Sequence, residues 1–492
     1  MINKKTRWGV SGDAILLMAI KFVTIALGLA ITRLLSEYLT VYDYGTYSQI
    51  LLIVSTVSAF TILGMADGIN YFNSVERDEK KRESCVSTIF SLQCIAGAAA
   101  GCFVMLLCGP LCRYFDNPGL KRLIIFAAAL PLLQNLLSML QVLIVSIGRA
   151  RLLAFRNLAV SLIRLGIVTF VVHVVQETAI ILSATVLLDV IQIFLFWTML
   201  KKSGYAIDLR KTDFSLSKNI FYYCAPMAVF MMINILNRDI DKYFVSLMTD
   251  IETSAIYLNA SKALPFDIIV TSFCTVLLPE ITRLIAAREN AKAVSVYKTF
   301  LEIAYVSTGT LCCAAMAASP QLMKLLYSNK YLSGLSVFCI YILVDLFRFT
   351  NITLVLSAAG KTKKLMYLGA GSLLANVVLN AVLFKLFDIN GPALSTLAVT
   401  AVTGIMMMSM SAKELGTTIG GFFDKKYLGI FVLESLAATA VFYAVQSWLE
   451  IKDVHYFVIL MTICGAYGLL MLALHGKRMF RSLKKVNETT KK

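Results

Sequence analysis

Long runs of apolar residues recur along the whole chain, and they constrain its fold more than any other feature. A helix needs about 20 mostly apolar residues to cross the hydrocarbon core of a bilayer. Only 15% of the 492 residues are charged, whereas soluble domains carry about a quarter. The sequence therefore predicts an all-α polytopic membrane protein with fourteen transmembrane helices. The expected spans are roughly 10–35, 46–72, 86–112, 123–147, 153–175, 179–200, 220–248, 253–284, 298–319, 334–358, 364–387, 391–412, 427–448 and 454–475.

The basic residues between these runs predict the orientation of the chain. Counting every second loop from the N-terminus, one face collects most of the 46 Lys and Arg residues. Cytoplasmic loops carry such an excess, so we expect both termini in the cytoplasm. The net charge of +17 thus follows from membrane topology and gives no reason to expect a nucleic-acid partner.

Two pairs of similar segments indicate an internal repeat. YGTYSQI, which begins at Tyr44, resembles SAIYLNA at Ser254, and SIGRAR at Ser146 resembles AAGKTK at Ala358. The nearly constant offset predicts a duplicated six-helix unit with both copies in the same orientation, as in transporters that move two lobes around a central site. We therefore expect two six-helix lobes around a central cavity. The predicted parts are an N-terminal lobe (1–200), a cytoplasmic connector (201–219), a C-terminal lobe (220–413), two additional helices (427–475) and a basic cytoplasmic tail (476–492).

Four charged residues interrupt one apolar run of helix length, NILNRDIDKYFVSLM at 234–248. They are Arg238, Asp239, Asp241 and Lys242. A charge near the middle of a bilayer costs at least a few kcal/mol and usually marks a transport or ligand path. Helical spacing pairs Arg238 with Asp241 and Asp239 with Lys242, three residues apart in each case. Alternatively, these are two self-neutralising pairs that lock neighbouring helices together.

Further charges lie inside other predicted spans or at their ends. Arginine and lysine heads suit phosphate and diphosphate, so a cavity lined by them predicts an anionic headgroup as ligand. Each of these charges also has a purely structural explanation. Lys21 and Lys262 can extend to the membrane interface, and Arg33 can anchor a helix end there. Asp345 can pair with Arg348 without taking part in binding. The candidate substrate-binding cations are Lys21, Arg33, Arg164, Arg238, Lys242, Lys262 and Arg348, and the candidate ion-coupling acids are Asp239, Asp241 and Asp345.

Enzymatic, metal and cofactor chemistry have little support in the sequence. The three histidines, His173, His455 and His475, fall at helix ends or in the tail, and the eleven cysteines include no CxxC pair. Neither a Walker loop nor GxSxG nor HExxH occurs. We therefore expect no metal, no cofactor and no catalytic residue.

Several segments are similar to a known family. ITRLLSEYLTVYDYGTYSQI, NRDIDKYFVSLM followed by SAIYLNASKALP, and the loops GRAR and GKTK resemble the polysaccharide transporters of the multidrug, oligosaccharidyl-lipid and polysaccharide (MOP) exporter superfamily. The resemblance covers essentially the entire chain, although its motifs are loose. It implies an inverted V of two six-helix lobes in the bacterial cytoplasmic membrane.

The resemblance also implies a function. Members flip undecaprenyl-diphosphate-linked oligosaccharide to the outer leaflet by alternating access, for cell-surface polysaccharide biosynthesis. The expected partners are this lipid-linked oligosaccharide, membrane lipids and polysaccharide-assembly proteins. The carboxylates Asp239, Asp241 and Asp345 add proton or sodium as an expected coupling ion, or coupling to the membrane potential. In related fourteen-span flippases, two extra helices hold the lipid tail; here the spans from Tyr427 and Val454 match them by position.

Three alternatives stay open at this stage. The first is a flippase for the lipid-linked peptidoglycan precursor, with the same fold. The second is a multidrug or cation antiporter, whose cavity would be dominated by carboxylates. The third, of a different class, is a membrane-embedded polymerase or ligase of lipid-linked sugars, for which the external loops are short.

Overall fold

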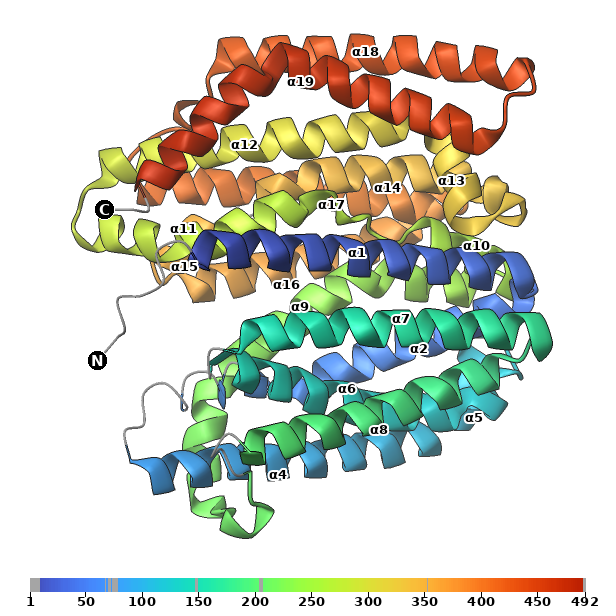
Figure 1. Cartoon of the computed structure of the whole chain (residues 1–492), viewed down its shortest axis with the longest axis vertical. Coiled ribbons are helices and arrows are strands. Elements are labelled where there is room, and N and C mark those ends of the chain that lie inside the picture. Colours follow the sequence, from blue (N-terminus) through green and yellow to red (C-terminus); the bar gives the residue numbers. More distant parts are fainter. Residues whose placement is uncertain are drawn as a thin grey trace. The chain divides into compact units, whose positions relative to one another are not determined.

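A computed structural model describes residues 9–66, 68–69, 72, 78–146, 149–202, 207–351 and 353–489. Within these ranges the regular elements are α-helices and short 3-10 helices, with no strand. Figure 1 shows these helices coloured along the sequence. The all-α fold predicted from the apolar runs is confirmed.

The chain divides into two compact units. The first contains Met1–Asp239 and Ser246–Ala255, and the second contains Ile240–Val245 and Ile256–Lys492. The division falls within helix α9 (Ser217–Met248), beyond the connector predicted at 201–219. The predicted lobe boundaries themselves stay a prediction.

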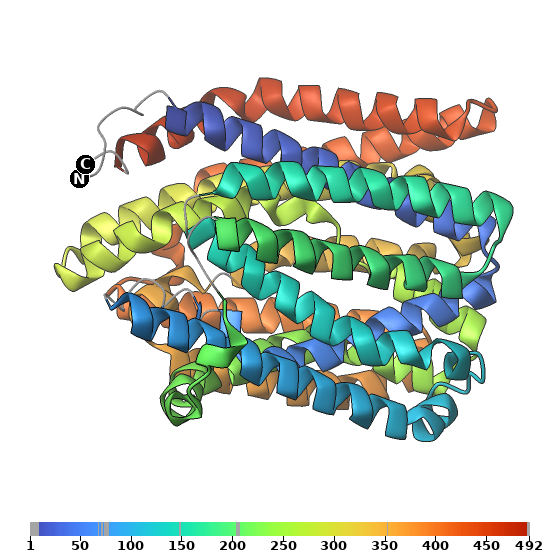
Figure 2. The ribbon, with the colours of Figure 1, turned by 60° about the horizontal axis from the view of Figure 1, so that its bottom comes forward.

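In the first unit, α6 contacts α2, α4 and α8, while α1 packs along α7. Figure 2 shows α6, α7 and α8 side by side. The core of this unit joins Phe90 of α4, Leu140 of α6 and Phe196 of α8. The elements are α1 (Gly9–Tyr38), α2 (Val41–Ile62), α4 (Glu79–Leu106), α5 (Cys108–Tyr114), α6 (Leu120–Ser146), α7 (Ala150–Val174), α8 (Thr178–Lys202), η1 (Leu209–Lys211) and η2 (Phe214–Leu216).

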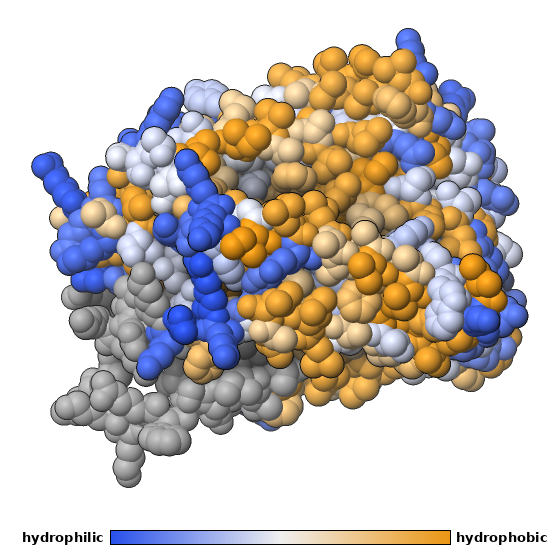
Figure 3. Space-filling view, turned by 90° about the horizontal axis from the view of Figure 1, so that it is seen from above, coloured by the Kyte–Doolittle hydropathy of each residue, from blue (hydrophilic) through white to orange (hydrophobic). Residues whose placement is uncertain are grey.

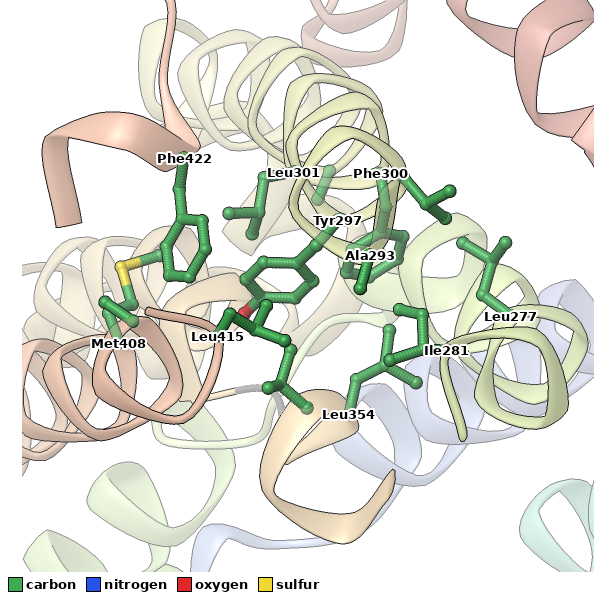
Figure 4. Packing of buried hydrophobic residues seen from close by; sticks show 14 of the residues in the cluster. Leu277, Ile281, Ala293, Tyr297, Phe300, Leu301, Leu354, Met408, Leu415 and Phe422 are labelled. Carbon is green, nitrogen blue, oxygen red and sulfur yellow. The ribbon is translucent and has the colours of Figure 1, made fainter. Parts of the chain in front are cut away.

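In the second unit, α12 contacts α11, α14, α18 and α19. Its residue Tyr297 packs edge-on against Phe422, with ring centroids 4.8 Å apart, in a buried cluster (Figure 4). The elements are α10 (Ile251–Ala260), η3 (Pro265–Asp267), α11 (Ile268–Ala286), α12 (Asn290–Ala317), α13 (Ser319–Tyr327), η4 (Asn329–Gly334), α14 (Leu335–Arg348), η5 (Phe349–Asn351), α15 (Leu354–Ala358), α16 (Thr362–Phe387), α17 (Asn390–Glu414), η6 (Ile419–Phe422), α18 (Lys425–Ile451) and α19 (Tyr456–Thr489). The first five residues of α10 belong to the first unit.

The two C-terminal helices are tied to α12 by one arginine. Arg478 of α19 donates two hydrogen bonds to the Glu302 carboxylate, at 2.9 and 2.7 Å, and one to Asp424 at 2.8 Å. Its guanidinium also lies 3.6 Å from the centre of the Tyr427 ring. Asp424 lies outside the spans, and the bond from Arg478 holds the pKa of its carboxyl below the usual value. The segment predicted as a basic tail thus begins as a continuation of α19, because Arg478 has a buried partner in Glu302 and no proline interrupts the helix.

The number of membrane spans is only partly established. Within the described ranges, eleven helices are long and apolar enough to cross a membrane, or twelve if the two bent parts of α9 form one span. The prediction has two more spans than these twelve. The predicted span 10–35 coincides with α1, which is not among the twelve. The predicted span 253–284 is divided between two helices, α10 and α11. Proline 265 explains this break, because it lacks the N–H that a continuous helix needs. The total of fourteen therefore stays a prediction.

The outer surface agrees with a membrane location. Figure 3 looks onto the molecule from the side of α18 and α19 and shows apolar residues over the middle and hydrophilic residues toward both ends. Exposed Leu433 and Leu436 of α18 and Leu469 and Leu472 of α19 contribute to such apolar surface. A soluble protein rarely exposes so much of it. The chain is a multi-pass membrane protein.

The buried cluster of Figure 4 gives a test of the fold. Replacing Phe422 by Ala leaves a cavity against Tyr297, and we expect the free energy of unfolding to fall by about 3 kcal/mol or more. Unfolding in detergent, followed by circular dichroism against denaturant, measures the loss. The control is Phe480→Ala, whose ring is 71% exposed; equal effects of the two substitutions would contradict the packing described.

Candidate functional site

The four charged residues predicted in one run lie on α9, and they divide into two neighbouring pairs. In the first unit, Arg238 Nη2 lies 2.8 Å from Asp239 Oδ2 and donates a 2.9 Å hydrogen bond to Ser55 on α2. Asp239 is buried, whereas half of the Arg238 side chain is exposed. The predicted pairing of Arg238 with Asp241 is wrong, because Asp241 has other partners.

Asp241 is the most enclosed acid of the cluster. Its Oδ2 accepts hydrogen bonds from the Tyr257 hydroxyl of α10, at 2.6 Å, and from the Tyr341 hydroxyl of α14. Lys242 Nζ lies 3.9 Å from Oδ1 and 5.8 Å from the Tyr341 ring centre. In the described part of the chain, Oδ1 has no hydrogen-bond donor although it is fully buried. The second unit thus holds a buried carboxylate whose Oδ1 accepts no hydrogen bond from the described residues and has Lys242 as its nearby cation.

A buried polar side chain without a hydrogen-bond partner among the described residues, Asn380, lies on α16. Phe244, three residues after Asp241, packs against Phe384, four residues after Asn380, with ring centroids 5.6 Å apart. Both helices begin at the face predicted to be cytoplasmic, so this contact brings Asp241 and Asn380 to a similar level. Asn380 is fully buried, and within the described residues neither its amide oxygen nor its nitrogen has a partner. Carboxylate and amide oxygens are typical ligands of small hard cations.

Asp345 has a structural partner in the same unit. Its Oδ2 accepts a 2.9 Å hydrogen bond from the backbone N–H of Leu264, at the break between α10 and η3. Its Oδ1 lies 3.0 Å from Arg348 Nη1, so the expected pairing with Arg348 is present. Nearby in the chain, Lys262 Nζ donates to Asn259 at 2.6 Å. The carboxylate therefore holds the broken helix in place.

The first unit has its own charged cluster on α7 and α8. Arg164 Nη2 lies 4.0 Å from Asp189 Oδ1, and the carboxylate also accepts a 3.1 Å hydrogen bond from Gln192. Arg156 donates to Gln192, lies 4.4 Å from the centre of the Phe196 ring, and interacts electrostatically with Asp189. One buried carboxylate thus faces two guanidinium groups. Among the described residues, the Nε–H groups of both arginines are buried without an acceptor.

Arg156 and Gln192 of this cluster are not among the candidates named from the sequence. Arg156 lies near the start of the predicted span 153–175 and was therefore assigned to the basic cytoplasmic face. The available signal was its distance of eight residues from Arg164, which is about two turns and places both on one side of the helix. Two other predicted cations lie on α1, outside these clusters. Arg33 pairs with Glu37 at 2.6 Å, and Lys21 is exposed.

Many apolar helices, with charged clusters held inside the helical units, define a multi-pass membrane protein. The family model described as polysaccharide biosynthesis protein matches residues 31–335, more than half of the chain. The chain therefore belongs to this polysaccharide biosynthesis protein family. No curated protein matches it by sequence.

Solved structures show the same fold at low identity. A lipid II flippase MurJ in an inward closed conformation matches with a TM-score of 0.69 and 16% identity, over 95% of this chain and 100% of that one. An inward-facing multidrug resistance MATE family transporter of the MOP superfamily matches with a TM-score of 0.66 and 14% identity, over 82% and 98%. A MOP superfamily transporter from Pyrococcus furiosus gives 0.53 and 13%, over 82% and 94%. These likenesses show a shared fold, in agreement with the expected all-α membrane fold.

The hydroxyl groups around Asp241 give a direct prediction. In Tyr257→Phe the buried carboxylate loses one donor, so we expect the free energy of unfolding to fall by about 1 to 3 kcal/mol. Adding Asp241→Asn should make the two effects clearly non-additive, because both act on one hydrogen bond. Denaturant unfolding in detergent measures both. The matched control is Tyr222→Phe, at a site 86% exposed; an equally small loss in Tyr257→Phe would contradict the assigned contact.

Proposed function

We propose that this protein flips undecaprenyl-diphosphate-linked oligosaccharide from the cytoplasmic to the outer leaflet of the bacterial cytoplasmic membrane, by alternating access. Membership of a polysaccharide biosynthesis family and a fold similar to that of a lipid II flippase support it. Both termini are proposed to lie in the cytoplasm, as the distribution of basic residues predicts. Proteins of polysaccharide assembly are the proposed partners.

The observation that carries this proposal is the excess positive charge between α7 and α8. Arg156 and Arg164 share a single carboxylate, Asp189, inside helices that are long and apolar enough to cross a membrane. A positive charge inside a membrane needs a counter-charge. A diphosphate supplies one, and guanidinium groups bind it with short, charge-assisted hydrogen bonds.

The other predicted cations are proposed as further contacts along the substrate's route. Arg33, Arg238, Lys242 and Arg348 each have an acidic neighbour within 4 Å. An arriving phosphate would compete with that acid, so binding stays reversible and the substrate is able to leave. Lys21 and Lys262 complete the proposed set. That these side chains face one shared cavity, between lobes at 1–200 and 220–413, remains a proposal drawn from the sequence.

The two C-terminal helices are proposed to accept the polyprenyl tail. The flippase match covers 95% of the chain and the MATE match 82%, a difference of about 64 residues. This difference is close to the combined length of α18, with 27 residues, and α19, with 34. The larger coverage of the flippase match therefore supports a role of α18 and α19 in binding lipid-linked substrates, which a transporter of small drugs does not need.

A peptidoglycan-precursor flippase is the second candidate function. The specific observation in its favour is the same match, which spans the whole length of a lipid II flippase. An antiporter of drugs or cations is less well supported, because the α7 and α8 cluster has more arginines than acids. Two substrates therefore need to be compared in one assay.

A coupling ion is proposed at Asp241, with Asp239 and Asp345 as the other candidates from the sequence. The unused Asp241 Oδ1 and the unpaired amide of Asn380 offer oxygen ligands in one unit. Asp345 Oδ1 likewise has no hydrogen-bond donor among the described residues. Asp241 is preferred because its cation, Lys242 Nζ, lies 3.9 Å away, whereas the arginines paired with Asp239 and Asp345 lie 2.8 and 3.0 Å from those acids.

Vesicle flipping tests the main proposal. The intact chain should move a fluorescent polyprenyl-diphosphate oligosaccharide between leaflets, with loss of signal to an external quencher as the measurement. Arg156→Gln and Arg164→Gln should each slow flipping by about tenfold or more, since a hydrogen bond to a charged group contributes about 1.5 to 3 kcal/mol. Arg238→Ala and Arg348→Ala test the second set of contacts in the same assay.

The matched control is Arg122→Gln, which removes an exposed arginine paired with Glu177 and should leave the rate unchanged. Normal flipping by Arg156→Gln and Arg164→Gln would reject the assigned headgroup site. Faster transport of a lipid-linked peptidoglycan precursor than of the oligosaccharide would instead favour the second function.

Ion coupling is tested with gradients across the same vesicles. In the intact protein, either an imposed sodium gradient or an imposed proton gradient should accelerate flipping. In Asp241→Asn we expect the response to that gradient to disappear, while flipping without a gradient continues at a comparable rate. The control is Asp388→Asn, outside the α9 cluster. A full gradient response in Asp241→Asn would show that another acid couples the ion.

A further inference from the structure

A long apolar groove lies on the surface of the second unit, between α16 and α17. Its volume is about 610 Å³, within the range of small-ligand sites. Tyr367, Val402 and Met406 on its walls are 70%, 57% and 47% exposed. The lining residues are Lys364, Tyr367, Leu368, Gly371, Ser372, Ala375 and Leu379 of α16, with Ala398, Val399, Val402, Thr403, Met406 and Met410 of α17.

The length of the groove matches one leaflet of a membrane. Its lining runs along α16 from Lys364 to Leu379, about 22 Å at the helical rise of 1.5 Å per residue. One leaflet contributes about half of the 30 Å hydrocarbon core, plus its headgroup layer. A single acyl chain entering from one face thus fits the groove, whereas an extended polyprenyl chain is far longer.

One end of the groove is strongly basic. Lys361, Lys363 and Lys364 lie at the start of α16, and Lys413 lies near the end of α17. Glu414 is the acid among them, with its carboxylate 2.7 Å from Lys364 Nζ and 3.7 Å from Lys361 Nζ. Four lysines against one glutamate leave a clear positive excess. Basic pockets between helices at the cytoplasmic side of a membrane bind anionic lipid headgroups.

We propose that this groove binds one anionic phospholipid of the cytoplasmic leaflet. Its phosphate lies at Lys363 and Lys364, and one acyl chain follows the groove past Gly371 toward Leu379. The charge excess explains a preference for an anionic headgroup, and the apolar walls explain the chain. This site is separate from the diphosphate contacts of α7 and α8, so it stands whether or not the protein flips an oligosaccharide.

Lipid quenching of a local tryptophan tests the site. The full chain carries Tyr367→Trp as reporter, with Trp8, Trp197 and Trp448 replaced by Phe, in vesicles of phosphatidylcholine. Brominated phosphatidylglycerol or brominated phosphatidylcholine is then added in steps. We expect half-maximal quenching at a several-fold lower fraction of the anionic lipid. Equal quenching by the two lipids would overturn the proposal.

A control reporter separates the groove from general attraction to lysine. Leu433→Trp, in the same tryptophan-free background, lies on α18 two turns after Lys425 and Lys426, with the native side chain 70% exposed. It should report little preference between the two lipids. A preference as large as that of Tyr367→Trp would show that nearby positive charge alone attracts the lipid.

Two substitutions in the reporter protein test the two parts of the site. Lys363→Gln with Lys364→Gln should remove most of the preference for the anionic lipid, because each lysine near a membrane surface contributes about a fivefold effect. Gly371→Leu should fill the groove without a clash, since no atom lies within 4 Å of a Cβ built there, and should lower quenching by both lipids. An unchanged preference in the double lysine variant, or unchanged quenching in Gly371→Leu, would refute the assigned position.

Discussion

The cost of an ionised side chain in apolar surroundings underlies the whole arrangement. Each buried acid described above has a partner on its own helix, on another helix or on both, since an unpaired charge in a membrane costs several kcal/mol. Asp241 of α9 is held by tyrosines of α10 and α14, and Asp189 of α8 by arginines of α7. These contacts hold helices of the same unit together. At Asp189, two arginines face one carboxylate, so the positive charge exceeds the negative charge.

The two clusters have opposite electrostatic character. Around Asp189, two arginines exceed one acid, so the cluster is suited to an anionic group. Around Asp241, one lysine at 3.9 Å and two neutral hydroxyls leave a carboxylate oxygen unused, so the cluster is suited to a small cation. Each of the two clusters is built within a single unit.

The positions of the long helices could be predicted from the sequence, whereas the hydrogen-bond and ion-pair partners of the charged residues mostly could not. Apolar runs located the long helices, because burial in lipid requires about 20 apolar residues regardless of tertiary context. The pairing of Arg238 with Asp241 predicted from helical spacing was wrong. Asp241 is bonded to tyrosines of two other helices, and the sequence of α9 contains no sign of these partners. Arg156 was missed because its position near a helix end resembled an ordinary interfacial arginine. The break before α11 was readable from Pro265, yet the high apolar content on both sides concealed it.

The contact between Glu302 and Arg478 has a consequence for biogenesis. Glu302 is synthesised and inserted long before Arg478 leaves the ribosome, so for that interval α12 carries a carboxylate without its guanidinium. A chain that terminates early keeps this defect permanently, even when most of its helices are intact. The ion pair thus makes the neutralisation of a carboxylate on α12 depend on an arginine of α19 that is synthesised 176 residues later.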